Sequence, residues 1–179
     1  AFPLRRVRCG LTWLKTSRYV ASLVRGFKAC TVVSDREREI ISRIVPAFHP
    51  VEVIPNCLDV SDYEGIQAHP KPGTLIFTGS LAYSANYDAV CFFLRYIYPL
   101  IRQAIPEATF RVTGRTDGNC LPAGIGDTGV HLTGYVDDVK PLIANSWVSV
   151  VPLRTGGGTR LKILAALALG TPVVSTSKG

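Results

Sequence analysis

The chain has 179 residues, 47% of them apolar and 18% charged, which is the composition of a globular protein and excludes a disordered one. Its length fits one domain, or one domain with part of a second. No apolar run reaches the ~18 residues that a membrane-spanning helix requires, and we expect neither such a helix nor a signal peptide in this sequence.

The positive charge is concentrated at one end of the chain. The net charge is +7, and residues 1–34 contain seven basic side chains and no acidic one. The basic and acidic side chains of residues 35–179 are therefore equal in number. We therefore expect no nucleic-acid partner. The basic segment can make peripheral contact with anionic lipid, or it can be the solvated face of a helix that packs on another part of the protein. Charge-rich faces are usually solvated, which favours the second interpretation.

Neither the cysteines nor the histidines form a metal-binding pattern. The five cysteines are scattered without a C-x-x-C motif, and the three histidines are isolated. We therefore expect no metal site. We also expect a cytoplasmic protein whose thiols are reduced. Membrane association through the basic segment stays open.

The first third of the chain alternates between helical and strand patterns. Ser34 and Glu37 have the spacing of a capping box and predict a helix that begins at Asp35. The expected elements are helix 11–28, strand 29–33, helix 35–44, strand 51–54 and a connector over 56–73.

A second series of strands and helices begins at Thr74. The expected elements are strand 75–78, helix 86–104, strands 109–113 and 130–132, a helix capped by Asp137 that reaches 145, strand 147–151, helix 159–169 and strand 172–175. Gly170 would end the last helix. Strands that alternate with helices predict an α/β fold, here a Rossmann-like parallel sheet flanked by helices.

Glycine recurs where the strands of this second series end. The four strand exits read Gly79-Ser80, Gly114-Arg115, Gly134-Tyr135 and Gly156 to Gly158. In parallel sheets, ligands bind beyond the carboxyl ends of the strands. Turn geometry alone would explain one or two of these glycines, and four at one edge predict a ligand that lies close to the backbone.

The last strand exit has the features of a diphosphate site. A glycine triplet leaves backbone amides unpaired, and the helix expected from Thr159 would point the positive end of its dipole at an anion. Arg160 and Lys162 add two cations in the first turn. The alternative interpretation is that the three glycines are needed only for the geometry of the turn. The two cations favour the anion site.

Four segments occur in the order and spacing of a known family. They are 53–59 (VIPNCLD), 75–90 (LIFTGSLAYSANYDAV), 134–139 (GYVDDV) and 156–176. In these segments the chain resembles the family 4 glycosyltransferases, the group 1 type with two facing Rossmann-like domains. The first segment is similar to the interdomain signature of that family, which usually reads I-P-N-G-V-D. The resemblance covers nearly the whole chain.

The resemblance implies a division of the chain into parts of two domains. Residues 1–55 would be the tail of an N-terminal acceptor domain, 56–73 an interdomain linker, and 74–179 a nucleotide-sugar-binding domain that is incomplete at its C-terminus. The implied reaction moves a sugar from a nucleotide-diphosphate donor to an acceptor with retention of configuration, without a cofactor or an essential metal. The chain by itself is expected to be an inactive fragment. The sequence does not identify the donor base, the sugar or the acceptor.

The resemblance also implies donor contacts. In the family, the residues that match Gly156 to Thr159 contact the diphosphate, Arg160 and Lys162 are candidate phosphate cations, and the pair that matches Tyr135-Val136 flanks the base. The donor-binding candidates are Gly79, Ser80, Arg115, Tyr135, Val136, Gly156, Gly157, Gly158, Thr159, Arg160, Lys162 and Ala165. For Arg115, a phosphate contact and a surface ion pair are equally open. No catalytic residue is assigned.

Two positions depart from the family pattern. The family's E-x₇-E motif falls on Gly157 and Ala165, and its second glutamate normally holds the ribose hydroxyls. Its loss would weaken donor binding by ~1–3 kcal/mol. Ser80 also stands where many relatives have arginine.

The alternative function is therefore a non-catalytic relative that binds nucleotide sugars or acts as a scaffold. The interpretation of the chain as a nicotinamide-dependent oxidoreductase has less support, because the sequence after the first strand lacks the G-x-G-x-x-G motif at Gly79.

Overall fold

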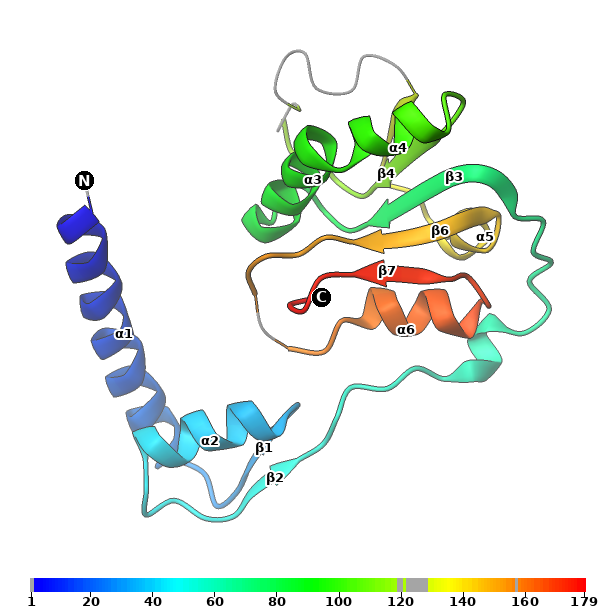
Figure 1. The fold of residues 1–179 in the computed structure, drawn as a ribbon. Coiled ribbons are helices and arrows are strands. Elements are labelled where there is room, and N and C mark those ends of the chain that lie inside the picture. The colour runs from blue at the N-terminus through cyan, green and yellow to red at the C-terminus, as the bar shows by residue number, and fades with distance from the viewer. Residues whose placement is uncertain (1, 119–120, 122–128, 157) are drawn as a thin grey trace. The chain divides into compact units, whose positions relative to one another are not determined.

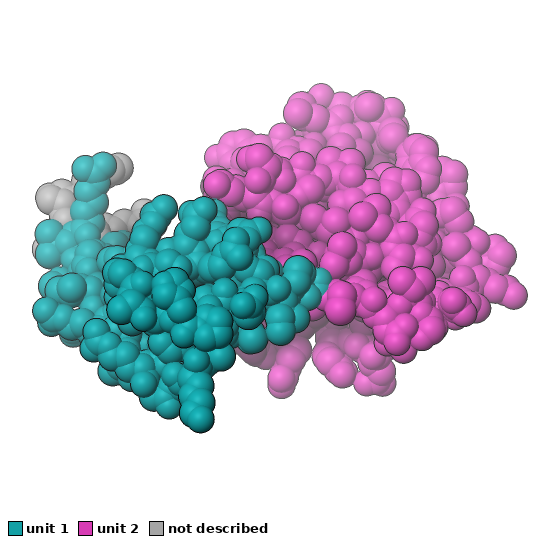
Figure 2. Space-filling model, turned by 90° about the horizontal axis from the view of Figure 1, so that it is seen from below, with its two compact units in different colours: residues 1–56 teal, residues 57–179 magenta. Residues whose placement is uncertain are grey.

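The computed structural model describes residues 2–118, 121, 129–156 and 158–179. They form two compact units, residues 1–56 and 57–179, which Figure 2 shows in different colours. Each unit is described by itself. None of the described helices combines the length and the apolar composition needed to cross a bilayer.

The first unit pairs two helices with a small parallel sheet (Figure 1). Its elements are α1 (Phe2–Val24), β1 (Cys30–Val32), α2 (Asp35–Ile44) and β2 (Val51–Val53). The predicted cap of α2 is confirmed, because the amide of Glu37 donates to Ser34 Oγ at 3.3 Å. The Glu37 carboxylate in turn accepts from the amide of Val33 at 3.1 Å. These two bonds satisfy donors at the start of the helix, which explains why it begins where the sequence predicts.

The second unit is built on a five-stranded sheet, and all its strands are parallel. Its elements are the 3₁₀ helix η1 (Val60–Tyr63), β3 (Lys71–Thr78), α3 (Ser84–Tyr96), α4 (Tyr98–Ala104), β4 (Thr109–Thr113), β5 (Val130–Gly134), α5 (Lys140–Ala144), β6 (Ser146–Val151), α6 (Leu161–Ala168) and β7 (Val173–Ser175). The strand order is β5-β4-β3-β6-β7. The predicted α/β class and the Rossmann-like parallel sheet are confirmed.

Helices cover both faces of this sheet (Figure 1). On one face, Leu75 and Phe77 of β3 join a large apolar core with α3 and α4. On the other face, Ile76 packs with Ile143 of α5 and Ala166 of α6. Neighbouring residues of a strand point to opposite faces, so one continuous apolar strand serves two layers.

Several predicted elements differ from the structure. The helix expected over 11–28 is α1, which begins at Phe2 and ends at Val24. The helix expected over 86–104 is broken into α3 and α4 at Ile97, because Pro99 lacks the amide that would continue the hydrogen-bond ladder. The prediction that Asp137 caps the next helix is wrong. Asp138 accepts from the amide of Lys140 at 3.0 Å instead, and α5 begins there. The predicted connector also ends early, since β3 begins at Lys71.

The end of α6 agrees with the sequence. Gly170 has a positive φ of 72°, and its amide donates to the Leu167 carbonyl at 3.0 Å. The amide of Thr171 donates to the Ala166 carbonyl at 2.9 Å. These two bonds form a Schellman motif, which requires a left-handed residue and therefore favours glycine.

Candidate functional site at the carboxyl ends of β3, β4 and β6

The strand order reverses between β3 and β6. From β3 the chain continues outward through β4 and β5, whereas β6 and β7 add to its other side. The strands are parallel, so their carboxyl ends meet at one edge of the sheet (Figure 1). Such a reversal leaves a crevice where ligands of open α/β sheets bind. The exits of β3 and β6 therefore flank the expected ligand position.

Gly79 and Gly114 are each explained by contacts within the second unit. Both have positive φ, at 143° and 124°. A Cβ atom on Gly114 would lie 2.6 Å from the carbonyl carbon and oxygen of Gly79. This contact accounts for Gly114, whereas a Cβ atom on Gly79 would lie 2.8 Å from Asn86 Nδ2 and from Lys162 Nζ. Neither glycine is by itself evidence for a ligand.

Ser80 and Arg115 continue this contact between the two loops. Ser80 Oγ donates to the Arg115 carbonyl at 3.1 Å, and the amide of Leu81 donates to the same oxygen at 2.8 Å. The Arg115 side chain is exposed, and its Nε lies 3.8 Å from Asp117 Oδ1. Of the two interpretations that the sequence left open for Arg115, the structure contains the surface ion pair.

Lys162 projects from the first turn of α6 to the exit of β3. Its Nζ donates to Asn86 Oδ1 at 3.2 Å and lies 4.2 Å from the centroid of the Phe77 ring. Burial, together with the smaller effect of the nearby Arg160 charge, lowers the pKa of Lys162 to about 8. A Cβ atom on Gly79 would lie 2.8 Å from the Lys162 Nζ atom. The lysine is thus a half-buried cation between the two strand exits.

Arg160 takes a different direction from Lys162. Its Nη2 donates to the carbonyl of Lys178 at 2.9 Å, and its Nε donates to the same oxygen at 3.3 Å. The guanidinium also lies beside Gly156, where a Cβ atom would approach it to 3.1 Å. Arg160 therefore joins the glycine turn to the segment that follows β7.

The helix α6 begins at Leu161, two residues later than predicted, and no side chain caps its N-terminus. Within the described residues, the amides of Gly158, Thr159 and Lys162 have no hydrogen-bond partner. Unpaired amides and the positive end of the helix dipole favour a bound anion. Gly157, which was assigned to the same contact, lies outside the described residues.

The remaining candidates are less closely grouped. Tyr135 is 70% exposed after β5, and Val136 beside it is half-buried. Ala165 is half-buried on α6, one turn after Lys162. In the described part of the chain, no hydrogen bond or ion pair joins the side chains of these three residues to Lys162. Their assignment to the base and the ribose stays a prediction.

Two features of the site were not predicted from the sequence. Asn86, interpreted only as the start of a helix, contacts Lys162 from 76 positions away. Arg154, at the start of the glycine turn, binds both carboxylate oxygens of Asp88 at 3.0 and 2.5 Å and lies 4.7 Å from the centroid of the Phe92 ring. Asp88 and Phe92 are one helical turn apart, a spacing that could have indicated a shared partner.

The described residues contain no group of three or more histidine, cysteine, aspartate or glutamate side chains arranged to hold a metal ion. The expectation of a metal-free site comes from the cysteine and histidine pattern and from the family resemblance, and it stays a prediction.

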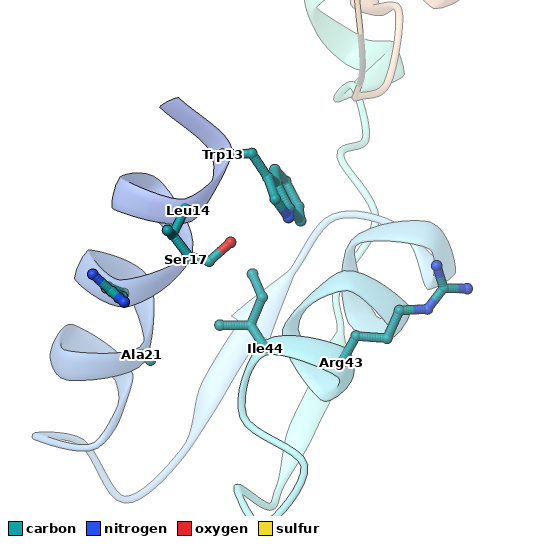
Figure 3. A pocket seen from close by; sticks show the side chains of 7 residues that line it. Trp13, Leu14, Ser17, Ala21, Arg43 and Ile44 are labelled. Atoms are coloured by element: carbon teal, nitrogen blue, oxygen red, sulfur yellow. The ribbon is translucent and has the colours of Figure 1, made fainter. Parts of the chain in front are cut away.

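A pocket also lies in the first unit, between α1 and α2 (Figure 3). Its volume is about 530 Å³, and it is lined by Trp13, Leu14, Ser17, Arg18, Ala21, Arg43 and Ile44. No predicted donor-binding residue contributes to it. Lipid contact through the basic residues of α1 is not tested by this arrangement and stays a prediction.

The sheet order defines a Rossmann-like α/β domain, and the amides that are unpaired among the described residues make the start of α6 a candidate anion site. The sequence model of the group 1 glycosyl transferases matches residues 72–179. The chain therefore belongs to the group 1 glycosyltransferase family. No match was found among curated protein sequences.

Solved structures with the same fold include two that were determined with UDP. One is the pneumococcal O-GlcNAc transferase GtfA with UDP and GlcNAc, which is 19% identical with a TM-score of 0.66; the match covers 90% of this chain and 32% of GtfA. The other is Anabaena HepE with UDP and glucose, 16% identical with a TM-score of 0.65; the match covers 92% of this chain and 49% of HepE.

A third similar structure is WaaG, a glycosyltransferase involved in lipopolysaccharide biosynthesis. It is 17% identical with a TM-score of 0.55, and the match covers 83% of this chain and 44% of WaaG. This chain thus spans about a third to a half of the length of these proteins.

Proposed function

We propose that this chain is the donor-binding part of a retaining glycosyltransferase, and that it holds the diphosphate of a nucleotide sugar at the start of α6. One observation carries this proposal. The amides of Gly158, Thr159 and Lys162, which have no partner in the part of the chain that the structure describes, lie at the same strand edge as the Lys162 ammonium. Fixed amide dipoles and a half-buried cation stabilise the negative charge that develops on a diphosphate as the glycosidic bond breaks.

The other residues have supporting roles in this proposal. The backbone at Gly79 and Ser80 approaches the diphosphate from β3, and Tyr135 and Val136 flank the base. Arg160 holds the glycine turn against the Lys178 carbonyl. The nucleotide sugar is a substrate, and no cofactor takes part. The presence of UDP in the GtfA and HepE structures supports a nucleotide diphosphate ligand.

Binding tests this proposal more directly than turnover, because the chain spans only part of the length of its structural relatives. Isothermal titration with UDP, GDP and their sugars should give saturable binding below millimolar concentration for at least one nucleotide. Lys162→Met should weaken it tenfold or more. Lys71→Met, which alters an exposed lysine of the same unit, is the matched control and should bind as the wild type does. Absence of saturable binding would reject the donor site.

The alternative is a non-catalytic relative that binds nucleotide sugars or acts as a scaffold. Ala165 favours it, because this position lacks the carboxylate that holds the ribose in the family. Binding of UDP without a preference for the ribonucleotide over its 2′-deoxy form would support this alternative, since it would show that the ribose hydroxyls have no partner.

A further inference from the structure

The Lys162 ammonium has one hydrogen-bond acceptor among the described residues, the side-chain oxygen of Asn86 at 3.2 Å. Its other close neighbour is the Phe77 ring, 4.2 Å away at the centroid. A half-buried ammonium is costly unless it is hydrogen-bonded. Asn86 therefore carries most of the polar stabilisation that keeps Lys162 charged in this position.

The side chain of Asn86 is itself held in one orientation. It is 9% exposed, and its Nδ2 donates to the Ser80 carbonyl at 2.9 Å. A carbonyl can only accept and an ammonium can only donate, so both contacts require the same orientation of the amide. Asn86 thus links the loop after β3 to the first turn of α6.

Gly79 provides the space for this pair. A Cβ atom there would lie 2.8 Å from both Asn86 Nδ2 and Lys162 Nζ. The absent side chain therefore leaves the ammonium and the amide side by side at the strand exit. The other charged group that acts on Lys162 is Arg160, whose guanidinium is bonded to the Lys178 carbonyl.

We propose that Asn86 is a positioning residue for the donor site, which holds the Lys162 ammonium at the exit of β3 where the diphosphate binds. This inference rests on the proposed function and adds a residue to it. Asn86 contacts no substrate atom in this proposal and acts through Lys162. Without this acceptor, the half-buried Lys162 ammonium loses its proton more readily, and the cation is depleted from the site.

The test combines two readouts on the whole chain. The first is the titration midpoint of the Lys162 ammonium, followed by NMR of ¹³C-labelled lysine. The second is the affinity for UDP at pH 7. Asn86→Ala should lower the midpoint and weaken UDP binding about tenfold. The nearly isosteric Asn86→Asp should raise the midpoint, because a carboxylate favours the charged lysine. It should also weaken UDP binding, because that carboxylate competes with the phosphate.

Asn145→Ala is the matched control. Asn145 also uses its side chain to hold a backbone group, since it accepts from the amide of His69 at 2.8 Å, and it lies before β6, at the opposite end of that strand from the site. It should change neither readout. A merely structural Asn86 would not move the midpoint in opposite directions in its two variants.

The outcomes separate this inference from the proposed function. If the wild type binds UDP and both Asn86 variants keep the wild-type midpoint and affinity, the positioning role is overturned and the donor site stands. If Asn86→Ala does not fold, the opposite shift in Asn86→Asp still decides the contact. Absence of UDP binding in the wild type would overturn the donor site and this role together.

Discussion

The backbone at Gly114 is packed closely on the backbone at Gly79, so that a Cβ atom on Gly114 would lie 2.6 Å from the carbonyl oxygen of Gly79. The amide of Gly79 also donates to the Thr113 carbonyl at 2.9 Å. The exits of β3 and β4 are therefore fixed relative to each other before any ligand binds, and this contact sets where the chain enters α3.

Gly114→Ala should destabilise the second unit strongly. The new Cβ atom would meet backbone, which cannot move aside as a side chain can, and φ at this position is 124°. We expect a loss of about 3 kcal/mol or more in the free energy of unfolding. Gly134→Ala is the control, since Gly134 has a positive φ of 69° but open space around it. It should cost only about 1 kcal/mol.

Urea unfolding followed by Trp147 in a Trp13→Phe background reports on the second unit, because the chain has two tryptophans and Trp147 lies in β6. Equal losses for the two alanine variants would contradict the close contact between the loops.

Lys162→Met should bind UDP weakly and yet be more stable than the wild type at pH 7. The folded state lowers the pKa of Lys162 from 10.5 to about 8, so below pH 8 the ammonium is charged in both states and the folded state bears its desolvation cost. That cost is on the order of 3 kcal/mol at most.

The same shift predicts how this difference depends on pH. Between pH 8 and 10.5 the unfolded chain holds the proton that the folded chain has released, so the stability of the wild type rises with pH. The advantage of Lys162→Met should therefore shrink by pH 10. Urea unfolding of both proteins at pH 7 and 10, with Lys71→Met as an exposed-lysine control, measures this trend. A constant difference would show that burial does not shift the lysine.

Ala165→Glu should strengthen donor binding if the domain holds a ribose as its relatives do. A carboxylate one turn after Lys162 could accept hydrogen bonds from the ribose hydroxyls, which is worth ~1–3 kcal/mol, or roughly a 5- to 150-fold gain in affinity. Leu167→Glu adds the same charge at a position of α6 that is 59% exposed, and it should not improve binding. Titration with UDP and 2′-deoxy-UDP tests for the ribose contact, because the gain in affinity should be absent for the deoxynucleotide. A gain of equal size for both ligands would speak against a ribose contact.

Local patterns predicted the order and type of the elements, and the errors in their bounds also have local causes, such as Pro99 between α3 and α4. The start of α2 follows from Ser34 and Glu37, which are three residues apart, and the end of α6 follows from Gly170 alone. Asp138, and not Asp137, accepts from the first amide of α5, a shift of one residue that periodicity does not resolve.

The candidate site was predictable as a region but not in its contacts. Arg160 and Lys162 look equivalent in the sequence, yet the carbonyl of Lys178, 18 residues further on, binds one of them. The other is held by Asn86, 76 residues before it. Only the folded sheet, which brings the exits of β3 and β6 together, distinguishes the two cations.

Ser17→Ala should stabilise the first unit. Ser17 Oγ is buried beside the pocket between α1 and α2 and has no hydrogen-bond partner among the described residues (Figure 3). Removing an unsatisfied buried hydroxyl gains about 1 kcal/mol, and alanine adds a small gain in helix propensity. Ser22→Ala is the control on the same helix, because Ser22 is exposed and its Oγ donates to the Tyr19 carbonyl at 2.8 Å. Urea unfolding followed by Trp13 in a Trp147→Phe background isolates this unit. The excess of Ser17→Ala over Ser22→Ala corrects for helix propensity and reports the buried hydroxyl together with the exposed Ser22 bond to Tyr19. An excess of zero would mean that the hydroxyl of Ser17 is hydrated in solution.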